Sequence, residues 1–265
     1  MTQPVEALGE PVAGERPFSE LPLSPAMLAN LQQLDYLTMT PIQAASLPLA
    51  LAGHDLIAQA KTGSGKTAAF GLALLNKLNP KNFAVQAMVL CPTRELADQV
   101  TQEIRRLARF EDNIKVLALV GGSTLRNQAT SLENGVHIVV GTPGRIMDHM
   151  ERGYLKLDEL ATLVLDEADR MLDMGFHDDI AYVAKRCPAR RQTLLFSATY
   201  PESIWNSTAR ARFASASTRS STKNGYRLSP RCSSTTVRSA RWLSATPSSN
   251  VATCSTCCVT RAFRR

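Results

Sequence analysis

Apolar and polar positions follow a pattern along the chain that predicts alternating strands and helices. Short apolar runs recur between longer stretches in which apolar residues return every three or four positions. The predicted strands are 55–59, 85–90, 114–120, 136–140, 161–166 and 191–198. Helices are predicted to begin at Lys66, Thr93, Ser123 and Pro143, with further helical pattern up to residue 187. Because β/α alternation needs crossover helices, we expect an α/β fold with a doubly wound parallel sheet.

Two further helix starts precede the first predicted strand. Ser24 with Pro25, and Thr40 with Pro41, each place a hydroxyl at the N-cap before a proline at the first helical position. Residues 1–17 are rich in Pro, Gly and Glu and lack apolar periodicity, so we expect a flexible lead-in there. One ordered domain is therefore expected over residues 18–203.

The composition changes abruptly at the end of this domain. Residues 203–265 hold ten Arg, one Lys, no acidic residue and 23 Ser or Thr, whereas the first 202 residues hold 19 basic and 23 acidic residues. The formal charge of +7 therefore belongs to the C-terminal segment. Since that segment shows no apolar periodicity, we expect a disordered basic tail with no folded domain over 204–265. A shifted reading frame near codon 203 would explain the change, and genomic DNA read in the other frames would test this hypothesis.

The remaining composition argues for a cytoplasmic protein without a membrane segment. Cys91 and Cys187 are the only cysteines in the first 202 residues, which fits a reducing compartment better than a disulfide framework. The N-terminus has no basic region followed by an apolar one, and no apolar run approaches the ~18–20 residues of a membrane span. The following residues lack the spacing of a zinc site: His137, His149, His177, Cys254, Cys257 and Cys258.

The strongest candidate for chemistry is the segment AKTGSGKT at 60–67, which joins a predicted strand to a predicted helix. A bound triphosphate needs converging backbone N–H groups, a countercharge and a hydroxyl for Mg²⁺. Gly63 and Gly65 let the loop wrap closely, Lys66 supplies the charge, and Thr67 supplies the hydroxyl. The first residue is alanine where the general pattern has glycine, so the match is to a subclass. The alternative is an ordinary glycine-rich turn that caps a helix.

A second candidate is the acidic segment DEAD at 166–169. Asp166 ends a predicted strand, at the edge where open α/β sheets bind their ligands. A carboxylate there can hold Mg²⁺, and the neighbouring Glu167 can polarise a water for attack on a phosphate. Taken alone, the segment is equally compatible with a solvated acidic helix start, which the helix dipole favours.

Taken together, the motifs have a characteristic order. They are YLTMTPIQ (36–43), AKTGSGKT (60–67), PTRELA (92–97), Gly121–Gly122, TPGR (142–145), DEAD (166–169) and SAT (197–199). In this order they resemble the DEAD-box ATP-dependent RNA helicases over about residues 18–203. The sequences that flank these motifs are most similar to bacterial members directed to large-subunit ribosomal RNA. The resemblance implies a RecA-like P-loop domain that binds ATP and RNA.

The resemblance also implies roles for individual residues toward ATP and Mg²⁺. The implied nucleotide-binding residues are Phe18, Gln43, Lys61, Thr62, Gly63, Ser64, Gly65, Lys66 and Thr67. Gln43 would read the adenine edge and Phe18 would pack on the adenine. The implied catalytic residues are Lys66, Asp166 and Glu167, with Asp166 and Thr67 holding Mg²⁺ and Glu167 acting as general base. Asp35 departs from the glycine that the family usually has before the aromatic residue of its first motif.

For RNA, the resemblance implies contacts to the sugar-phosphate backbone of one strand. The implied residues are Pro92, Thr93, Arg94, Gly121, Gly122, Thr142, Pro143, Gly144 and Arg145. Thr93 and Pro143 lie at predicted helix starts, where free N–H groups favour phosphate, and such contacts read no sequence. Alternatively, Thr93 is only an N-cap and Arg94 a solvated charge. Asp169 would pair with Ser197 and Thr199, and with Ala198 this segment would couple nucleotide state to strand separation.

Family helicases also use a second RecA-like domain, whose motifs we do not find after SAT. No ARGxD-like or HRxGRxxR-like segment follows residue 199. Three functions therefore stay open at this point. They are an ATP-dependent RNA helicase, an ATP- and RNA-binding fragment without unwinding, and a basic nucleic-acid-binding protein that acts through its C-terminal segment.

Overall fold

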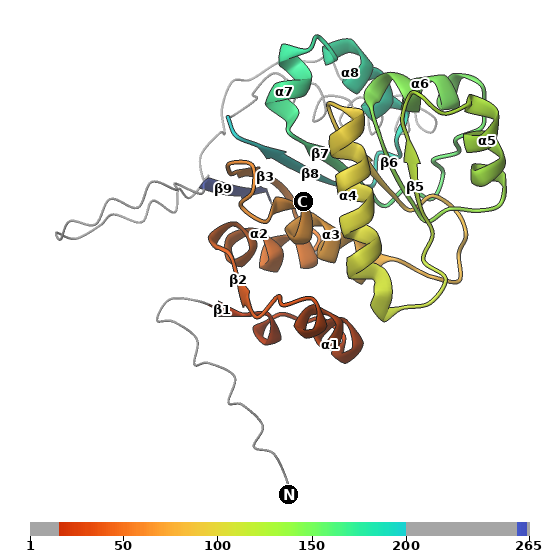
Figure 1. Ribbon diagram of the computed structural model, residues 1–265. Coiled ribbons are helices and arrows are strands. Elements are labelled where there is room, and N and C mark those ends of the chain that lie inside the picture. Colours follow the sequence, from red (N-terminus) through yellow and green to blue (C-terminus); the bar gives the residue numbers. More distant parts are fainter. Residues whose placement is uncertain (1–15, 200–258, 264–265) are drawn as a thin grey trace, which may run out of the picture.

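The computed structural model describes residues 16–199 and the segment 259–263 (Figure 1). Within these residues a central sheet has the strand order β5-β6-β4-β7-β8-β3-β9. Its six parallel strands are β3 (Asp55–Gln59), β4 (Ala87–Leu90), β5 (Val116–Leu119), β6 (Ile138–Gly141), β7 (Thr162–Asp166) and β8 (Gln192–Ser197). The predicted α/β class with a parallel, helix-covered sheet is therefore confirmed, and each predicted strand corresponds to an observed one.

Helices cover both faces of this sheet. One face carries α1 (Pro25–Gln33), α2 (Pro41–Leu51), α3 (Lys66–Lys77) and α4 (Arg94–Leu107). The other carries α5 (Leu125–Glu133), α6 (Pro143–Glu151), α7 (Ala168–Asp173) and α8 (His177–Arg186). Two short 3-10 helices are η1 (Phe18–Glu20) and η2 (Ala108–Phe110). Among the described residues, no helix combines the length and apolar character needed to cross a bilayer.

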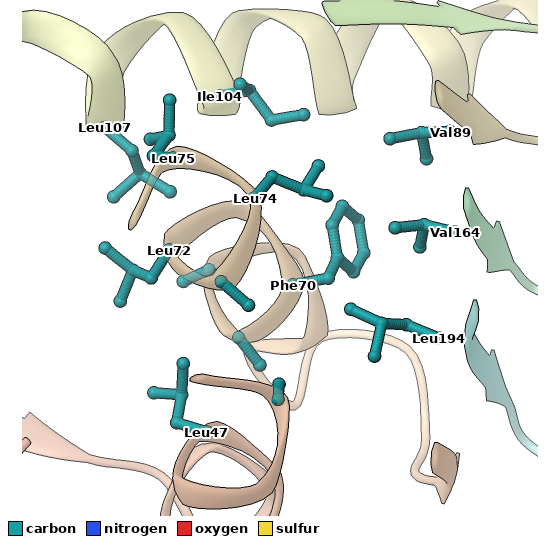
Figure 2. Packing of buried hydrophobic residues seen from close by; sticks show 14 of the residues in the cluster. Leu47, Phe70, Leu72, Leu74, Leu75, Val89, Ile104, Leu107, Val164 and Leu194 are labelled. Atoms are coloured by element: carbon teal, nitrogen blue, oxygen red, sulfur yellow. The ribbon is translucent and has the colours of Figure 1, made fainter. Parts of the chain in front are cut away.

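The core explains why the strands read as continuous apolar runs. In β4, Val89 packs on the face covered by α3, whereas Met88 and Leu90 pack on the opposite face. Since both faces are buried, successive residues of a strand must both be apolar. Figure 2 shows Phe70 of α3 pointing at the sheet residues Val89, Val164 and Leu194. This packing holds α3, and with it the loop that precedes it, against the centre of the sheet.

Capping residues fix where several helices begin. The Ser24 hydroxyl accepts a hydrogen bond from the Met27 N–H at 3.2 Å, and the Thr93 hydroxyl accepts one from the Leu96 N–H at 3.3 Å. The starts predicted at Lys66 and Pro143 are confirmed. The helix predicted from Ser123 begins instead at Leu125, because Thr124 takes the extended N-cap conformation.

The structure adds a short strand at each end of the predicted domain. Arg16–Pro17 form β1, which pairs with β2 (Thr38–Met39), so structure extends into the predicted lead-in. Val259–Phe263 form β9, antiparallel to β3, in a segment where we expected no folded domain. β3 is the last of the six parallel strands, and β9 pairs with its outer side through backbone groups, which requires no periodic side-chain pattern. The rest of the two predicted flexible segments lies outside the described residues.

Candidate functional site

The two strongest motifs meet at the carboxyl edge of the sheet. The loop 60–67 connects β3 to α3, and the acidic segment 166–169 follows β7. Because parallel strands share one carboxyl edge, both segments come together there although β8 lies between their strands. The Thr62 hydroxyl donates a hydrogen bond to Oε1 of Glu167 at 3.1 Å, which joins the two motifs directly.

The loop has the shape of a phosphate cradle. Gly63 and Gly65 have φ values of +80° and +89°, a left-handed conformation that residues with a side chain rarely adopt. Lys66 is only 6% exposed, and its ammonium donates to the Ala60 carbonyl at 3.2 Å. The Ser64 hydroxyl donates to the Lys61 carbonyl at 2.7 Å, which tightens the loop. A buried ammonium at a helix N-terminus fits a triphosphate, since both favour negative charge.

Gln43 braces this loop from the side. Its Oε1 accepts the Thr40 N–H at 2.9 Å, and its Nε2 donates to the Gly65 carbonyl at 3.1 Å. The Thr40 hydroxyl adds a bond to the Ser64 carbonyl at 2.9 Å. A Cβ atom on Gly65 would lie 2.6 Å from Gln43 Nε2, so only glycine fits. The Thr-x-x-Gln spacing of a capping box could have indicated the first bond, but the contacts to the loop were missed at the level of sequence.

The two residues predicted to contact the adenine base are both buried. Gln43 is 1% exposed, and Phe18 is 3% exposed with its ring edge-on to Tyr36 at 6.2 Å. Both residues thus belong to the packed interior beside the loop, and their contacts with adenine stay predictions. Asp35, where the family usually has glycine, has a φ of +62°. The glycine-like turn is therefore kept, since aspartate tolerates the left-handed region better than most residues.

The acidic motif is held in an unusual backbone conformation. Glu167 has a φ of +51°, which is strained for a residue with a side chain and is typical of functional sites. Its N–H donates to Oδ1 of Asp166 at 3.0 Å, and Arg170 donates to its carboxylate at 3.3 Å. Asp166 itself is 2% exposed. Burial raises the pKa of Asp166 to about 6, although the nearby Lys66 charge lowers it in part.

This carboxyl group fits a divalent cation. A carboxylate that the fold buries beside Glu167 gains more from a metal ion than from water, since the ion relieves both desolvation and repulsion. Thr67, the second residue of α3, is half-buried and provides the hydroxyl expected of a Mg²⁺ ligand. Asp166 and Thr67 are thus the residues that would hold Mg²⁺.

In the absence of metal, Asp166 is expected to make the domain less stable as pH rises from about 4 to about 7. The folded state keeps the proton up to about pH 6, whereas the unfolded chain releases it near ~3.9. Between these values the folded state binds more protons, so the free energy of unfolding falls with pH, by an amount on the order of 3 kcal/mol.

Urea denaturation in a chelating buffer would measure this dependence. The matched control is Asp166→Asn, whose amide stays neutral across the range. The free energy of unfolding of the unmodified protein should fall relative to that of the variant between pH 4 and 7. Parallel curves for the two proteins would show that the pKa of Asp166 is not raised.

Asp169 lies next to the end of β8 and makes the predicted pairing. Its Oδ2 accepts from the N–H groups of Ala198 and Thr199 at 3.1 and 2.9 Å, and from the Thr199 hydroxyl at 3.1 Å. The Asp169 N–H donates to the Ser197 hydroxyl at 3.2 Å. Burial acts to raise the pKa of Asp169, but the bonds from Thr199 and Ser197 outweigh it and lower the pKa. The acidic motif is thus tied to SAT, while its coupling role stays a prediction.

The residues predicted for RNA converge on the same edge of the sheet. Arg94 begins α4, and its guanidinium lies against Gly121–Gly122, since a Cβ on Gly121 would approach Nη2 within 2.7 Å and one on Gly122 would approach Nη1 within 3.1 Å. Arg145 of α6 donates to the Ser123 carbonyl at 3.4 Å. Segments that are far apart in sequence thus form one surface, in which Arg94 is exposed.

The two helix starts on this surface have open backbone. Thr142 is the N-cap of α6, Pro143 is buried at its first position, and a Cβ on Gly144 would meet nothing within 4 Å. Pro92 is buried just before the N-cap Thr93, so the cap role that we weighed as the alternative for Thr93 is observed. Free N–H groups at both starts suit the phosphates of a nucleic acid.

Comparisons with known proteins agree with this arrangement. A family model described as DEAD/DEAH box helicase matches residues 40–206. Over 182 residues the chain is 62% identical to the ATP-dependent RNA helicase DbpA of Escherichia coli K12, covering 69% of this chain and 40% of that protein. It is 52% identical over 187 residues to the ATP-dependent RNA helicase CshA of Listeria monocytogenes, covering 71% and 36%.

Solved structures show the same fold. A DEAD box protein from the hyperthermophile Methanococcus jannaschii superimposes with a TM-score of 0.70 at 41% identity, over 74% of this chain and 54% of that one. The matched part of the chain spans only about two fifths of the length of the two curated relatives. The similarity thus covers the part of the chain that holds both motifs.

Proposed function

Because the chain belongs to the DEAD/DEAH box helicase family, we propose that it binds ATP with Mg²⁺ and the backbone of single-stranded RNA at one edge of its sheet. The observation that carries this proposal is the convergence of the phosphate-type loop, the acidic motif and the Arg94 surface at the carboxyl ends of the strands. In a complete two-domain helicase, this edge would couple ATP hydrolysis to local separation of RNA strands.

On the nucleotide side, each residue has a chemical task. The loop N–H groups and Lys66 would bind the β- and γ-phosphates, and Mg²⁺ held by Asp166 and Thr67 would offset their charge. Glu167 would accept a proton from the attacking water. Its carboxylate is already oriented by Thr62 and Arg170, so it is placed before the substrate arrives.

On the RNA side, Arg94, Arg145 and the two helix starts would contact phosphates. Such contacts give affinity without reading bases, so binding should depend strongly on salt and weakly on sequence. The sequences around the motifs resemble those of bacterial helicases directed to large-subunit ribosomal RNA. This resemblance supports ribosomal RNA as the target class. The same resemblance supports a role in ribosome assembly in the cytoplasm.

ATP is expected to compete for the site better than GTP by roughly ten- to a hundredfold, the discrimination of one good bidentate amide–base pair. Adenine offers a donor and an acceptor on its outer edge, whereas guanine offers two acceptors. Gln43 keeps one N–H and one lone pair free of its bonds to Gly65 and Thr40, which suits adenine.

Displacement of a fluorescent adenine nucleotide by ATP and by GTP would test this function. Gln43→Glu is a matched variant, because its carboxylate can still accept from the Thr40 N–H but cannot donate to the base or to Gly65. The variant should lose the preference for ATP. Equal displacement by ATP and GTP from the unmodified protein would contradict base reading by Gln43.

A further inference from the structure

The loop that carries Gly121–Gly122 is held by a side chain from outside the known motifs. Gln128 of α5 is 5% exposed, and its Nε2 donates to the Val120 carbonyl at 2.9 Å and to the Ser123 hydroxyl at 2.6 Å. These two partners flank the glycine doublet on either side. A single carboxamide therefore fixes both ends of the short loop against which the Arg94 guanidinium lies.

The other end of this carboxamide meets a fully buried histidine on α6. Nε2 of His149 lies 2.8 Å from Oε1 of Gln128, and His149 is 0% exposed. The Val120 carbonyl can only accept, so the amide nitrogen of Gln128 must face it and the amide oxygen must face the histidine. His149 therefore carries its proton on Nε2 and donates it to Gln128.

The remaining ring nitrogen agrees with this assignment. Nδ1 of His149 is buried and has no hydrogen-bond partner among the described residues. An unprotonated ring nitrogen tolerates burial without a partner better than an N–H group does. Burial, with a smaller contribution from the Arg145 charge, lowers the pKa of His149 and keeps the ring neutral. The hydrogen bonds from His149 through Gln128 to the loop thus run in one direction.

We propose that Gln128 and His149 are positioning residues that set the loop 120–123 against α6, so that its glycine doublet and the Arg145 helix start present phosphate contacts at a fixed separation. The inference rests on the proposed RNA function. Arg145 and His149 lie four residues apart and so share one face of α6. Arg145 donates to the Ser123 carbonyl, while His149 reaches the same loop from beneath through Gln128.

A purely structural role makes a different prediction. If the pair only filled the core, apolar residues of similar shape could replace it, and the cost would be limited to the hydrogen bonds that Gln128 donates to Val120 and Ser123. The replacement would then leave the RNA-binding loop in place and the RNA affinity unchanged. If the pair positions the loop, the same replacement leaves the fold intact but frees the loop, and ordering the loop again on binding costs affinity.

The test uses the full 265-residue chain and a fluorescent single-stranded oligouridylate at low salt. The double variant Gln128→Leu, His149→Phe should bind this RNA roughly tenfold more weakly. Its affinity for ATP should be unchanged, since neither residue touches the phosphate loop. His149→Phe alone should weaken RNA binding in the same direction. His149→Gln should retain it, because the glutamine amide can donate where Nε2 did.

Order parameters of the backbone N–H groups of residues 120–123, measured by nitrogen-15 relaxation, give a readout independent of RNA. They should fall in His149→Phe and the double variant and stay high in His149→Gln. If the unmodified protein binds no RNA, the proposed function fails while these order parameters still decide the positioning role. Unchanged loop order in the phenylalanine variants overturns the inference. The inference is also overturned if His149→Gln loses RNA affinity only in proportion to its loss of thermal stability. Should the double variant not fold, the two single variants give the same comparison.

Discussion

Lys66→Ala is expected to weaken ATP binding by roughly ten- to a hundredfold while the domain stays folded. The Lys66 ammonium is 6% exposed and is already held in the loop by the Ala60 carbonyl. The fold has thus desolvated this charge in advance, so a phosphate gains a preorganised partner without displacing much water from it. Removing it leaves the β- and γ-phosphates without their countercharge inside the cradle.

Calorimetric titration with Mg²⁺ and ATP would measure the effect. Lys81→Ala is the matched control, because it removes the same charge at an exposed position outside the nucleotide-binding loop. The control should retain most of the affinity, and thermal unfolding without nucleotide should show that both variants are folded. Equal ATP affinity in Lys66→Ala and the unmodified protein would show that the phosphates bind elsewhere.

The sheet was predictable from the sequence because burial on both faces leaves a strong local signal. Residues such as Leu163, Val164 and Leu165 alternate between the two cores, so an uninterrupted apolar run is required. The starts of α3 and α6 were equally local, since a glycine-rich loop and a Thr-Pro pair define them. Where the residues of a single segment determine a helix or strand, the local sequence pattern was enough to predict it.

The connections within the site depend on contacts between distant segments, which no local pattern contains. The Arg94 guanidinium reaches Gly121–Gly122 only because β4, β6 and β5 are neighbours in the sheet. The bond from Gln43 to Gly65 likewise depends on how α2 packs against α3. Gln128 and His149 belong to no motif that we recognised, and their pairing appears only once α5 and α6 are placed.

β9 illustrates a different limit of the sequence. It pairs with the outer side of β3, the last of the parallel strands, and the bonds between the two strands join backbone groups. Such pairing asks little of side chains, so the composition of the C-terminal segment gave no reason to expect a strand there. β9 adds one strand to the sheet, and the absence of a folded domain over 204–265 stays a prediction.

A polypeptide of these 265 residues is expected to hydrolyse ATP at least ~10³-fold more slowly than a complete two-domain helicase, and to separate no RNA duplex. The described domain contains the phosphate-type loop, the buried Asp166 carboxylate that is proposed to hold Mg²⁺, and Glu167 as the proposed base. By resemblance, the arginines that reach the γ-phosphate come from a second domain, and no ARGxD-like or HRxGRxxR-like segment follows residue 199. An arginine accelerates phosphoryl transfer only where the protein holds its guanidinium at the developing charge, a contribution of ~10³–10⁵ in rate.

RNA should therefore bind without stimulating turnover, because stimulation requires RNA to bridge two domains and close them over the nucleotide. Phosphate release with and without single-stranded RNA, together with separation of a short labelled duplex, would measure both activities. Glu167→Gln in the same polypeptide is the control for the origin of any residual rate, since it removes the base and keeps the shape of the side chain. A residual rate that survives Glu167→Gln comes from a contaminant. RNA-stimulated turnover together with duplex separation, both abolished in Glu167→Gln, would show that this chain completes its active site without a second RecA-like domain.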